Sequence, residues 1–292
     1  MVRYSKLPFR LLCLRWGCNL TFSPMIVAKD FNSSEFARDS EFTTNKMDVP
    51  LVVQFAANDA YELSSAAEKV VGHCQAIDIN CGCPQRWVMS EGYGSALLKK
   101  PDLISDMVRM TKERTNLPVS IKIRVDDDFR KTVDIVQRVE KVGVDWISVH
   151  GRTPKQKSTA PVNVEAIKLS KEHAHVPVIA NGDVFSLREA QAFQEETKVD
   201  GVMAARGILQ NPALYQGYDQ VPMECVRDFI DISVSLGTPF HSVHQHLMFM
   251  LYNVHNRYEK REFNRIHSLH GVYDYFSSRD LHWTQPRSSV FI

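Results

Sequence analysis

Short apolar runs alternate with longer amphipathic stretches over about the first 218 residues of the chain. The apolar runs are rich in Val and Ile, as expected for strands that are buried on both faces. The stretches between them have helical spacing; Pro101 suits a first helical turn, and Asn58 and Ser186 are candidate N-caps. The pattern predicts strands over 20–27, 51–57, 76–80, 119–124, 146–151, 178–183 and 201–207, and helices over 60–71, 101–115, 129–142, 164–173 and 186–197.

Repeated strand–helix units predict parallel strands joined by right-handed crossovers. Seven predicted strands are one fewer than a closed (β/α)8 barrel contains. We therefore expect an α/β fold of the TIM (β/α)8-barrel type that is not closed and leaves two sheet edges open. Residues 1–218 would form this barrel, residues 219–277 a small all-α domain, and residues 278–292 a poorly ordered tail.

Composition adds limits rather than a function. With 44% hydrophobic and 24% charged residues, the chain is ordinary for a globular protein. A net charge of +1 does not indicate a nucleic-acid binder, so an RNA partner would need a local basic surface. The six cysteines lack a disulfide-framework spacing, which indicates a reducing compartment; we expect the cytoplasm, with the nucleus as the alternative. No apolar run of about 18 residues occurs, so we expect no membrane partner.

Polar side chains lie at the ends of the predicted strands. Because the carboxyl ends of parallel strands meet at one mouth of a barrel, where active sites form, these side chains are expected to converge. Each one alone is equally well explained as a solvated strand end, but the same pattern on successive strands favours a site. The residues are Gln54, Asn80, Lys122, Arg124, His150 and Asn181.

The loops after the last two predicted strands have the character of a phosphate site. Gly182 and Gly207 allow tight turns, and Arg206 offers a fixed cationic fork. One phosphate fits a mononucleotide better than a dinucleotide, and no Gly-x-Gly-x-x-Gly follows a strand. FMN is therefore favoured over FAD or a tightly held NAD. Ordinary loop chemistry is the alternative explanation of the glycines.

The chain is organised around residues 78–98, DINCGCPQRWVMSEGYGSALL, where a buried strand ends in Asn-Cys-Gly-Cys-Pro. This segment, together with VRYSKLPFR, RDSEFTT and VQFAANDA, resembles the signature of the tRNA-dihydrouridine synthases, closest to the fourth eukaryotic type. The resemblance covers about residues 1–274. It implies an FMN-dependent enzyme that reduces uridine at positions 20a and 20b of tRNA, with NADPH or NADH as reductant.

The resemblance also assigns residues. Cys83 matches the proton donor, and a thiol with a pKa near 8.5 suits a general acid of modest strength. Lys122 would favour negative charge on the reduced flavin, while Asn80, Arg124 and Arg152 would contact the RNA substrate. The FMN contacts fall on Met1, Val2, Gln54, Lys122, His150, Asn181, Gly182, Asp183, Ala205 and Arg206.

In this family the first strand ends in Ala-Pro-Met, and the present chain begins at the position of that Met, as Met1. The resemblance therefore implies an N-terminally shortened barrel that lacks most of its first strand. We expect such a form to be less stable than its full-length relatives.

The helical region offers two candidate features. His241, His244 and His246 lack the HExxH spacing and a completing ligand pattern, so we expect no metal site. Basic residues recur at helical spacing with Glu259 and Glu262 between them, which fits either a solvated face or an RNA contact. The helical domain of the family binds tRNA, which favours the second explanation. These basic residues are Arg257, Lys260, Arg261 and Arg265.

Two other functions are compatible with the sequence. The first is a phosphate-site barrel of different chemistry, for example an aldolase with Lys122 as a Schiff base. The second is a non-catalytic RNA-binding remnant that has lost FMN because the first strand is missing. No protein partner can be inferred from the sequence.

Overall fold

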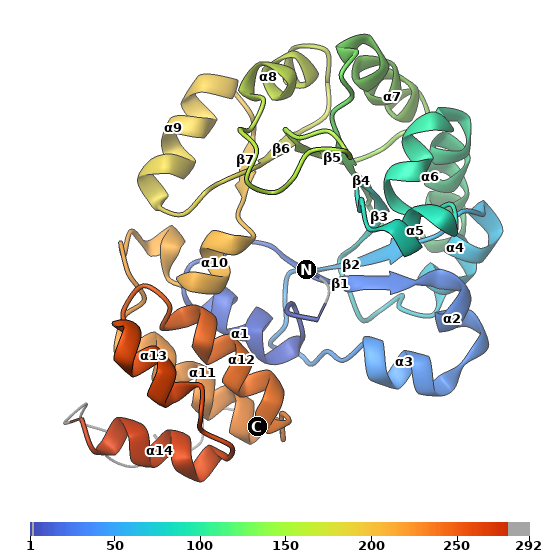
Figure 1. Ribbon diagram of the computed structural model, residues 1–292. Helices are drawn as coiled ribbons and strands as arrows, with labels where there is room; N and C mark the ends of the chain where they lie inside the picture. Colours follow the sequence, from blue (N-terminus) through green and yellow to red (C-terminus); the bar gives the residue numbers. More distant parts are fainter. Residues whose placement is uncertain (2, 280–292) are drawn as a thin grey trace.

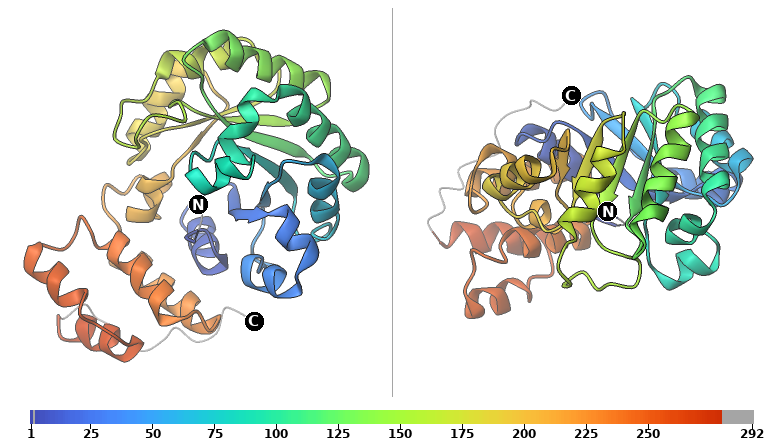
Figure 2. Two further views of the ribbon diagram at one scale, coloured as in Figure 1. Left: turned by 45° about the vertical axis from the view of Figure 1, so that its right-hand side comes forward. Right: turned by 90° about the horizontal axis from the view of Figure 1, so that it is seen from above.

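Seven parallel strands form a single sheet in the computed structural model, which describes residue 1 and residues 3–279 (Figure 1). The strands are neighbours in chain order, so β1 and β7 lie at the two ends of a curled, open sheet (Figures 1 and 2). The expected open barrel of the TIM type is thereby confirmed. The strands are β1 (Thr21–Val27), β2 (Leu51–Ala56), β3 (Ala76–Cys81), β4 (Val119–Arg124), β5 (Trp146–His150), β6 (Val178–Asn181) and β7 (Gly201–Met203).

Helices cover the outer face of the sheet, and the main core lies between the two layers. All five predicted barrel helices are present, with ends that differ from the prediction by at most a few residues. The larger ones are α4 (Ala60–Glu68), α6 (Pro101–Thr115), α7 (Phe129–Lys141), α8 (Val164–Glu172) and α9 (Leu187–Thr197). Short helical segments occur at α2 (Ala28–Ser33), α3 (Glu35–Glu41), α5 (Arg86–Ser90), η1 (Gly94–Lys99), α10 (Arg206–Gln210) and η2 (Leu214–Gln216).

The helix caps correct one detail of the sequence analysis. Ser186 caps α9 as predicted, in a capping box with Glu189. The prediction of Asn58 as the cap of α4 is wrong: the side chain of Asp59 accepts from Glu62 N–H. Asn58 instead donates to the carbonyl of Glu91, so its amide joins the loop after β2 to the loop after β3.

A second core lies in the helical region that follows the barrel. Its helices are α11 (Met223–Ser235), α12 (Phe240–Met250), α13 (Arg257–Phe263) and α14 (Leu269–Ser277). The N-terminal helix α1 (Leu7–Arg15) packs into this core, although it precedes the barrel in the sequence (Figure 1). Seven of its nine residues are buried, so it lacks the amphipathic pattern by which a helix is recognised. None of the described helices has the length and apolar character that crossing a bilayer requires.

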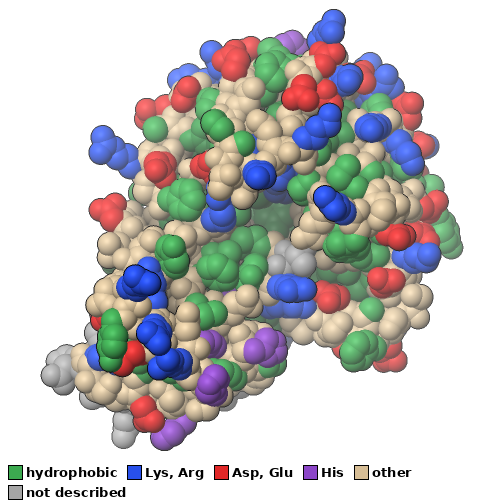
Figure 3. Space-filling model, viewed as in Figure 1, with side chains coloured by type: hydrophobic (Ala, Val, Ile, Leu, Met, Phe, Trp, Pro, Cys, Tyr) green, Lys and Arg blue, Asp and Glu red, His purple; other side chains and the backbone are tan. Residues whose placement is uncertain are grey.

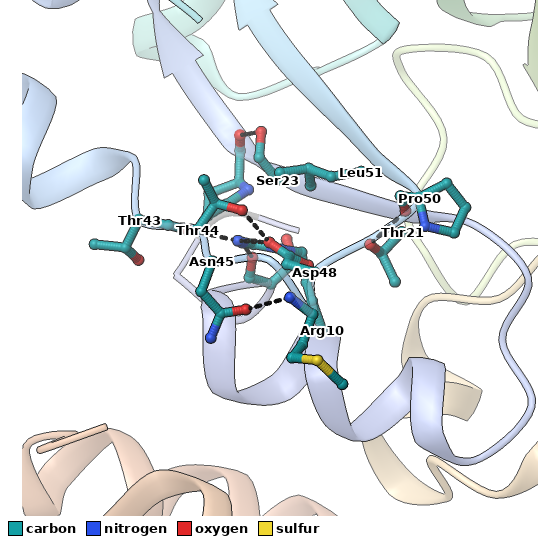
Figure 4. A network of polar contacts seen from close by, with 12 residues as sticks. Arg10, Thr21, Ser23, Thr43, Thr44, Asn45, Asp48, Pro50 and Leu51 are labelled. Carbon is teal, nitrogen blue, oxygen red and sulfur yellow. Dashed lines mark hydrogen bonds and ion pairs between the residues drawn. The ribbon is translucent and has the colours of Figure 1, made fainter. Parts of the chain in front are cut away.

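A buried ion pair joins α1 to the loop that leads into β2 (Figure 4). Arg10 Nη2 lies 2.6 Å from Asp48 Oδ2, and the two side chains are 2% and 0% exposed. Arg10 also donates to the carbonyls of Ser5 and Thr43, and Thr44 donates its hydroxyl to Asp48. The bonds of Arg10 to Asp48 and to the carbonyl of Ser5 are buried, so the pair fixes α1 against the barrel.

We expect Arg10→Met to lower the free energy of unfolding by about 3–5 kcal/mol, because it leaves the Asp48 carboxylate buried without its cation. Urea denaturation measures the change. The control is Arg109→Met, which breaks an exposed arginine–aspartate pair with Asp106 and should leave the free energy of unfolding nearly unchanged. Equal losses for the two variants would show that the Arg10–Asp48 pair does not hold α1.

Candidate active site

A cavity of about 560 Å³ lies at the carboxyl ends of the strands and extends along β1 and β7 to their amino ends. Figure 3 shows the hollow in the middle of the molecular face, with Lys and Arg side chains at its border. The six polar strand ends that the sequence predicts to converge all line this cavity, and Met1, Cys83 and Ala205 do so as well. Gly182, Asp183, Arg206 and Arg152 lie beside it rather than in its lining, and Val2 lies outside the described residues.

Strand register explains this convergence. Side chains two residues apart on a strand point to the same face of the sheet. Parallel pairing places each of these side chains beside the side chain of the paired residue on the adjacent strand. The pairing of Arg124 with His150, and of His150 with Asn181, makes one row across β4, β5 and β6. Asn80 pairs with Lys122 one row deeper. The residues of the site are therefore positioned by the sheet itself.

The loop that carries Cys83 is held from both sides. The side-chain oxygen of Asn80 accepts from the N–H groups of Gly82 at 3.1 Å and of Cys83 at 2.9 Å. The carbonyl of Cys83 accepts from Ser95 N–H at 3.0 Å, and Arg124 Nε donates to the carbonyl of Gly82 at 2.9 Å. Asn80 and Arg124, which the resemblance assigns to the substrate, thus also fix the backbone that presents the thiol.

The two cysteines of the motif differ in what they face. Cys81 is fully buried in the core between sheet and helices, and burial raises the pKa of its thiol well above the ordinary range. Cys83 is partly exposed and lines the cavity. Of this pair, only Cys83 is available to a molecule bound at the strand ends.

Charged groups crowd around the centre of the site. Burial lowers the pKa of Lys122 to about 8, with Asp78 opposing and Arg124 adding to the shift. Lys122 Nζ donates to Asn181 Oδ1 at 2.9 Å. Burial, followed by the nearby cations Lys122 and Arg124, lowers the pKa of His150 to about 2, so this imidazole is neutral at physiological pH. The site is therefore positive overall and suits an anionic ligand.

The loops after β6 and β7 bring a carboxylate between two guanidinium groups. Asp183 accepts from both Arg152 and Arg206. Arg152 is only 2% exposed, and its Nε also donates to the carbonyl of Ala160, so its guanidinium faces the protein. Gly207 has no room for a side chain, because an added Cβ would lie 2.0 Å from the carbonyl of Val184. The two loops therefore pack closely beside the cavity, with Arg206 partly exposed to solvent.

Sequence analysis did not single out Asp78 and Ser120. Both face the barrel interior, where Ser120 Oγ lies 2.6 Å from Asp78 Oδ1 and Gln54 Nε2 lies 2.7 Å from Asp78 Oδ2. The signal was present in the sequence, because Asp78 stands two residues before Asn80 on the same strand.

The predicted basic residues of the helical region lie at the surface, but their arrangement differs from the predicted stripe. Helix α13 ends at Phe263, so Arg265 does not continue the predicted stripe of Arg257, Lys260 and Arg261. Figure 3 shows Lys and Arg side chains gathered over this region, below the hollow. His244 and His246 are buried in the aromatic core instead. Among residues 1 and 3–279, no group of His, Cys, Asp and Glu has the arrangement of a metal site.

Comparison with known proteins identifies the class to which this fold and site belong. The family model described as dihydrouridine synthase matches residues 1–280, so the chain belongs to the dihydrouridine synthase family. It is 52% identical over 280 residues to the tRNA-dihydrouridine(20a/20b) synthase-like protein of Mus musculus, covering 95% of this chain and 86% of that protein.

A more distant relative agrees with this assignment. The tRNA-dihydrouridine(20a/20b) synthase of Schizosaccharomyces pombe is 42% identical over 253 residues, covering 86% of this chain and 77% of that protein. Among solved structures, a morphinone reductase complexed with tetrahydroNAD aligns at a TM-score of 0.49 and 10% identity over 81% of this chain and 83% of that one, which is too distant to support an argument.

We expect Gly94→Ala to disturb the Cys83 loop, whereas the matched variant Gly72→Ala does not. Both glycines have positive φ, +59° and +83°, so both variants pay the backbone cost of about 1–2 kcal/mol. An added Cβ meets the carbonyl of Cys83 at 2.6 Å in the first case and nothing within 4 Å in the second.

Alkylation of Cys83, followed by peptide mass spectrometry, measures this effect on the loop. Its rate should change by at least about threefold in Gly94→Ala and stay within twofold in Gly72→Ala, because thiol reactivity follows the local environment. Identical alkylation in the two variants would mean that Gly94 has no part in placing the thiol.

A second prediction concerns pH. Burial raises the pKa of Asp78 from 3.8 to about 6, although its hydrogen bonds with Ser120 and Gln54 and the charge of Lys122 oppose the shift. The folded protein therefore holds this proton more tightly than the unfolded chain, and the contribution of Asp78 to stability falls as pH rises from about 4 to about 6. In Asp78→Asn this dependence of stability on pH is absent, because an amide does not titrate.

Urea denaturation at intervals between pH 4 and pH 7 tests this. Relative to Asp78→Asn, the wild-type protein should lose about 2 kcal/mol across the window, since one pKa unit corresponds to about 1.4 kcal/mol. Parallel pH profiles for the two proteins would contradict it.

Proposed function

We propose that this protein is an FMN-dependent tRNA-dihydrouridine synthase that reduces uridine at positions 20a and 20b of tRNA with NADPH or NADH as electron source. The observation that carries the proposal is the meeting of Cys83, Lys122, His150 and Asn181 in one cavity. The full names of the relatives in mouse and fission yeast, which include NAD(P)+, support the substrate, the two positions and the class of reductant.

The residues of the cavity fit a flavin mononucleotide. Its volume of about 560 Å³ lies in the range of sites for ligands of this size. Its lining combines apolar side chains and backbone with polar groups that converge at the strand ends, which suits a flat ring carrying one polar edge. We assign the ring to Gln54, Lys122 and Asn181, and the phosphate to the loops that contain Gly182, Asp183, Ala205 and Arg206, with His150 between them and Met1 at the cavity wall.

Bound FMN that has been reduced by NADPH or NADH would supply a hydride to carbon 6 of the uracil ring. On the protein side, the Cys83 thiol donates the proton that carbon 5 requires, because Cys83 is the accessible cysteine of the motif. Lys122, protonated below about pH 8, stabilises negative charge beside it. Arg124 lines the cavity and donates to the carbonyl of Gly82 in the loop that carries Cys83. It is therefore placed to contact the substrate base while it holds this loop.

The substrate base must leave the RNA stack to enter this cavity. Lys and Arg side chains of the helical region lie on the same face of the molecule as the hollow (Figure 3), and we assign the basic residues of α13 to the phosphate backbone of tRNA. Arg152 is buried between Asp183 and Ala160, so its role as an RNA contact requires the guanidinium to turn outward. In the arrangement seen here it supports the phosphate loops.

We expect the purified protein to be yellow, with bands near roughly 370 and 450 nm, as flavins are. It should form dihydrouridine in tRNA when NADPH or NADH is added. Cys83→Ala should keep the flavin bands and lower product formation by at least about 100-fold, the usual contribution of a general acid. Absorption spectra and nucleoside mass spectrometry measure the two properties.

Cys81→Ala is the matched control. Its side chain lies in the core, so the variant should lose stability but keep its turnover. Retained turnover in Cys83→Ala would assign the acid to another group. A colourless protein that binds tRNA would select the non-catalytic alternative.

A further inference from the structure

Asp78 is a buried carboxylate that the proposed function leaves without a role. It is 0% exposed and is not among the residues that line the cavity, so it does not touch a bound ligand. Its Oδ1 accepts from the hydroxyl of Ser120 at 2.6 Å, and its Oδ2 accepts from the Gln54 amide at 2.7 Å. Burying a charge is unfavourable, so a group kept in this place needs a physical reason.

A series of hydrogen bonds leads from Asp78 through Gln54 and Asn80 to the loop that carries Cys83. An ionised carboxylate only accepts, so Gln54 must turn its NH2 group to Asp78 and its oxygen away from it. That oxygen accepts from Asn80 Nδ2 at 2.9 Å. Asn80 is then left with its own oxygen facing the N–H groups of Gly82 and Cys83. The acceptor at one end of the chain thus fixes the order of both amides.

We propose that Asp78 is a positioning residue for the thiol of Cys83, and that it acts through the amides of Gln54 and Asn80. The inference rests on the proposed role of Cys83 as the proton donor. Asp78 gives Gln54 a partner that cannot donate, and Gln54 in turn gives Asn80 a fixed anchor. The backbone of Cys83 is held on its N–H side by this chain and on its carbonyl side by Ser95.

A second explanation is that Asp78 only balances the charge of Lys122, which lies close enough to influence its pKa. The two explanations make different demands. Charge balance needs a negative group, whereas positioning needs an acceptor that faces Gln54. Asn at position 78 supplies the acceptor without the charge, because its NH2 group can face Ser120, whose hydroxyl also accepts.

Amide hydrogen exchange at Gly82 and Cys83 tests the proposal without any catalytic readout. Asp78→Leu should accelerate exchange of these two N–H groups by at least about threefold, because their acceptor loses its anchor. Asp78→Asn should restore exchange to within about twofold of the wild-type protein. Ser120→Ala, which removes one bond of Asp78 but keeps the bond to Gln54, should also stay within twofold.

Kinetics provide the second measurement. In Asp78→Leu, kcat for tRNA reduction should fall by about tenfold or more with KM within about twofold, as expected for a residue that orients the thiol rather than binds the substrate. Asp78→Asn should recover most of kcat. Failure of the proposed function would appear as inactive wild-type protein in which Asp78→Leu still accelerates exchange at Gly82 and Cys83. Failure of the positioning role would appear as active wild-type protein in which exchange is the same in Asp78→Leu, so the two failures are distinguishable.

If Asp78→Leu does not fold, Gln54→Leu breaks the same chain one residue further along and should accelerate exchange at Gly82 and Cys83 equally. Unchanged exchange in the folded variant, Asp78→Leu or Gln54→Leu, would overturn the proposal. So would Asp78→Asn exchanging as fast as Asp78→Leu, since that result selects charge balance with Lys122.

Discussion

The pleat of the parallel sheet is the constraint on which the rest of this structure depends. Side chains that stand two residues apart share a face, so β3 sends Asp78 and Asn80 into the barrel and Ile77, Ile79 and Cys81 into the outer core. A slip of one residue would exchange these sets and place a thiol and two Ile side chains where polar groups now lie. Burial of the apolar set therefore also fixes the polar set.

The polar interior that results is stable only because its charges are matched or neutralised. His150 stays neutral because it is buried among cations. Among the groups that raise the pKa of Lys122, Asp78 in the next row acts most strongly, and Asp78 in turn accepts hydrogen bonds from Ser120 and Gln54. Positive charge remains toward the open end of the cavity, from Arg124 and Arg206. The open end of the cavity is therefore positively charged and suits an anion, whereas deeper in the barrel the charge of Lys122 is balanced by that of Asp78.

The sequence predicts the repeating architecture well, because strands buried on both faces and amphipathic helices leave strong local patterns. All seven strands and five barrel helices follow from it. Helix α1 does not, because its residues are buried nearly all round and carry no amphipathic signal. The alternation of Val, Ile and polar residues likewise predicts which side chains reach the cavity, since it is a property of each strand alone.

Contacts between distant segments are the part that the sequence does not reveal. Arg152 follows a strand end in the sequence, yet the carboxylate with which it forms an ion pair, that of Asp183, lies on another loop. Asn80 reads as a free amide at a strand end, but the turn of the chain at Gly82 brings two N–H groups onto its oxygen. Such partners depend on how loops fold back, which no periodicity encodes.

Helix α1 makes the cavity and the helical region mechanically dependent on each other. Phe9 and Cys13 line the cavity, and Phe9 also stacks on His246 of α12 with ring centroids 4.5 Å apart. The neighbouring Arg10 is fixed to Asp48 in the loop before β2. The cavity therefore has a wall whose supporting contacts lie in the second core. Packing of α11 and α12 against α1 holds Phe9 in place, so the helical region stabilises the shape of the site as well as extending the surface beside it.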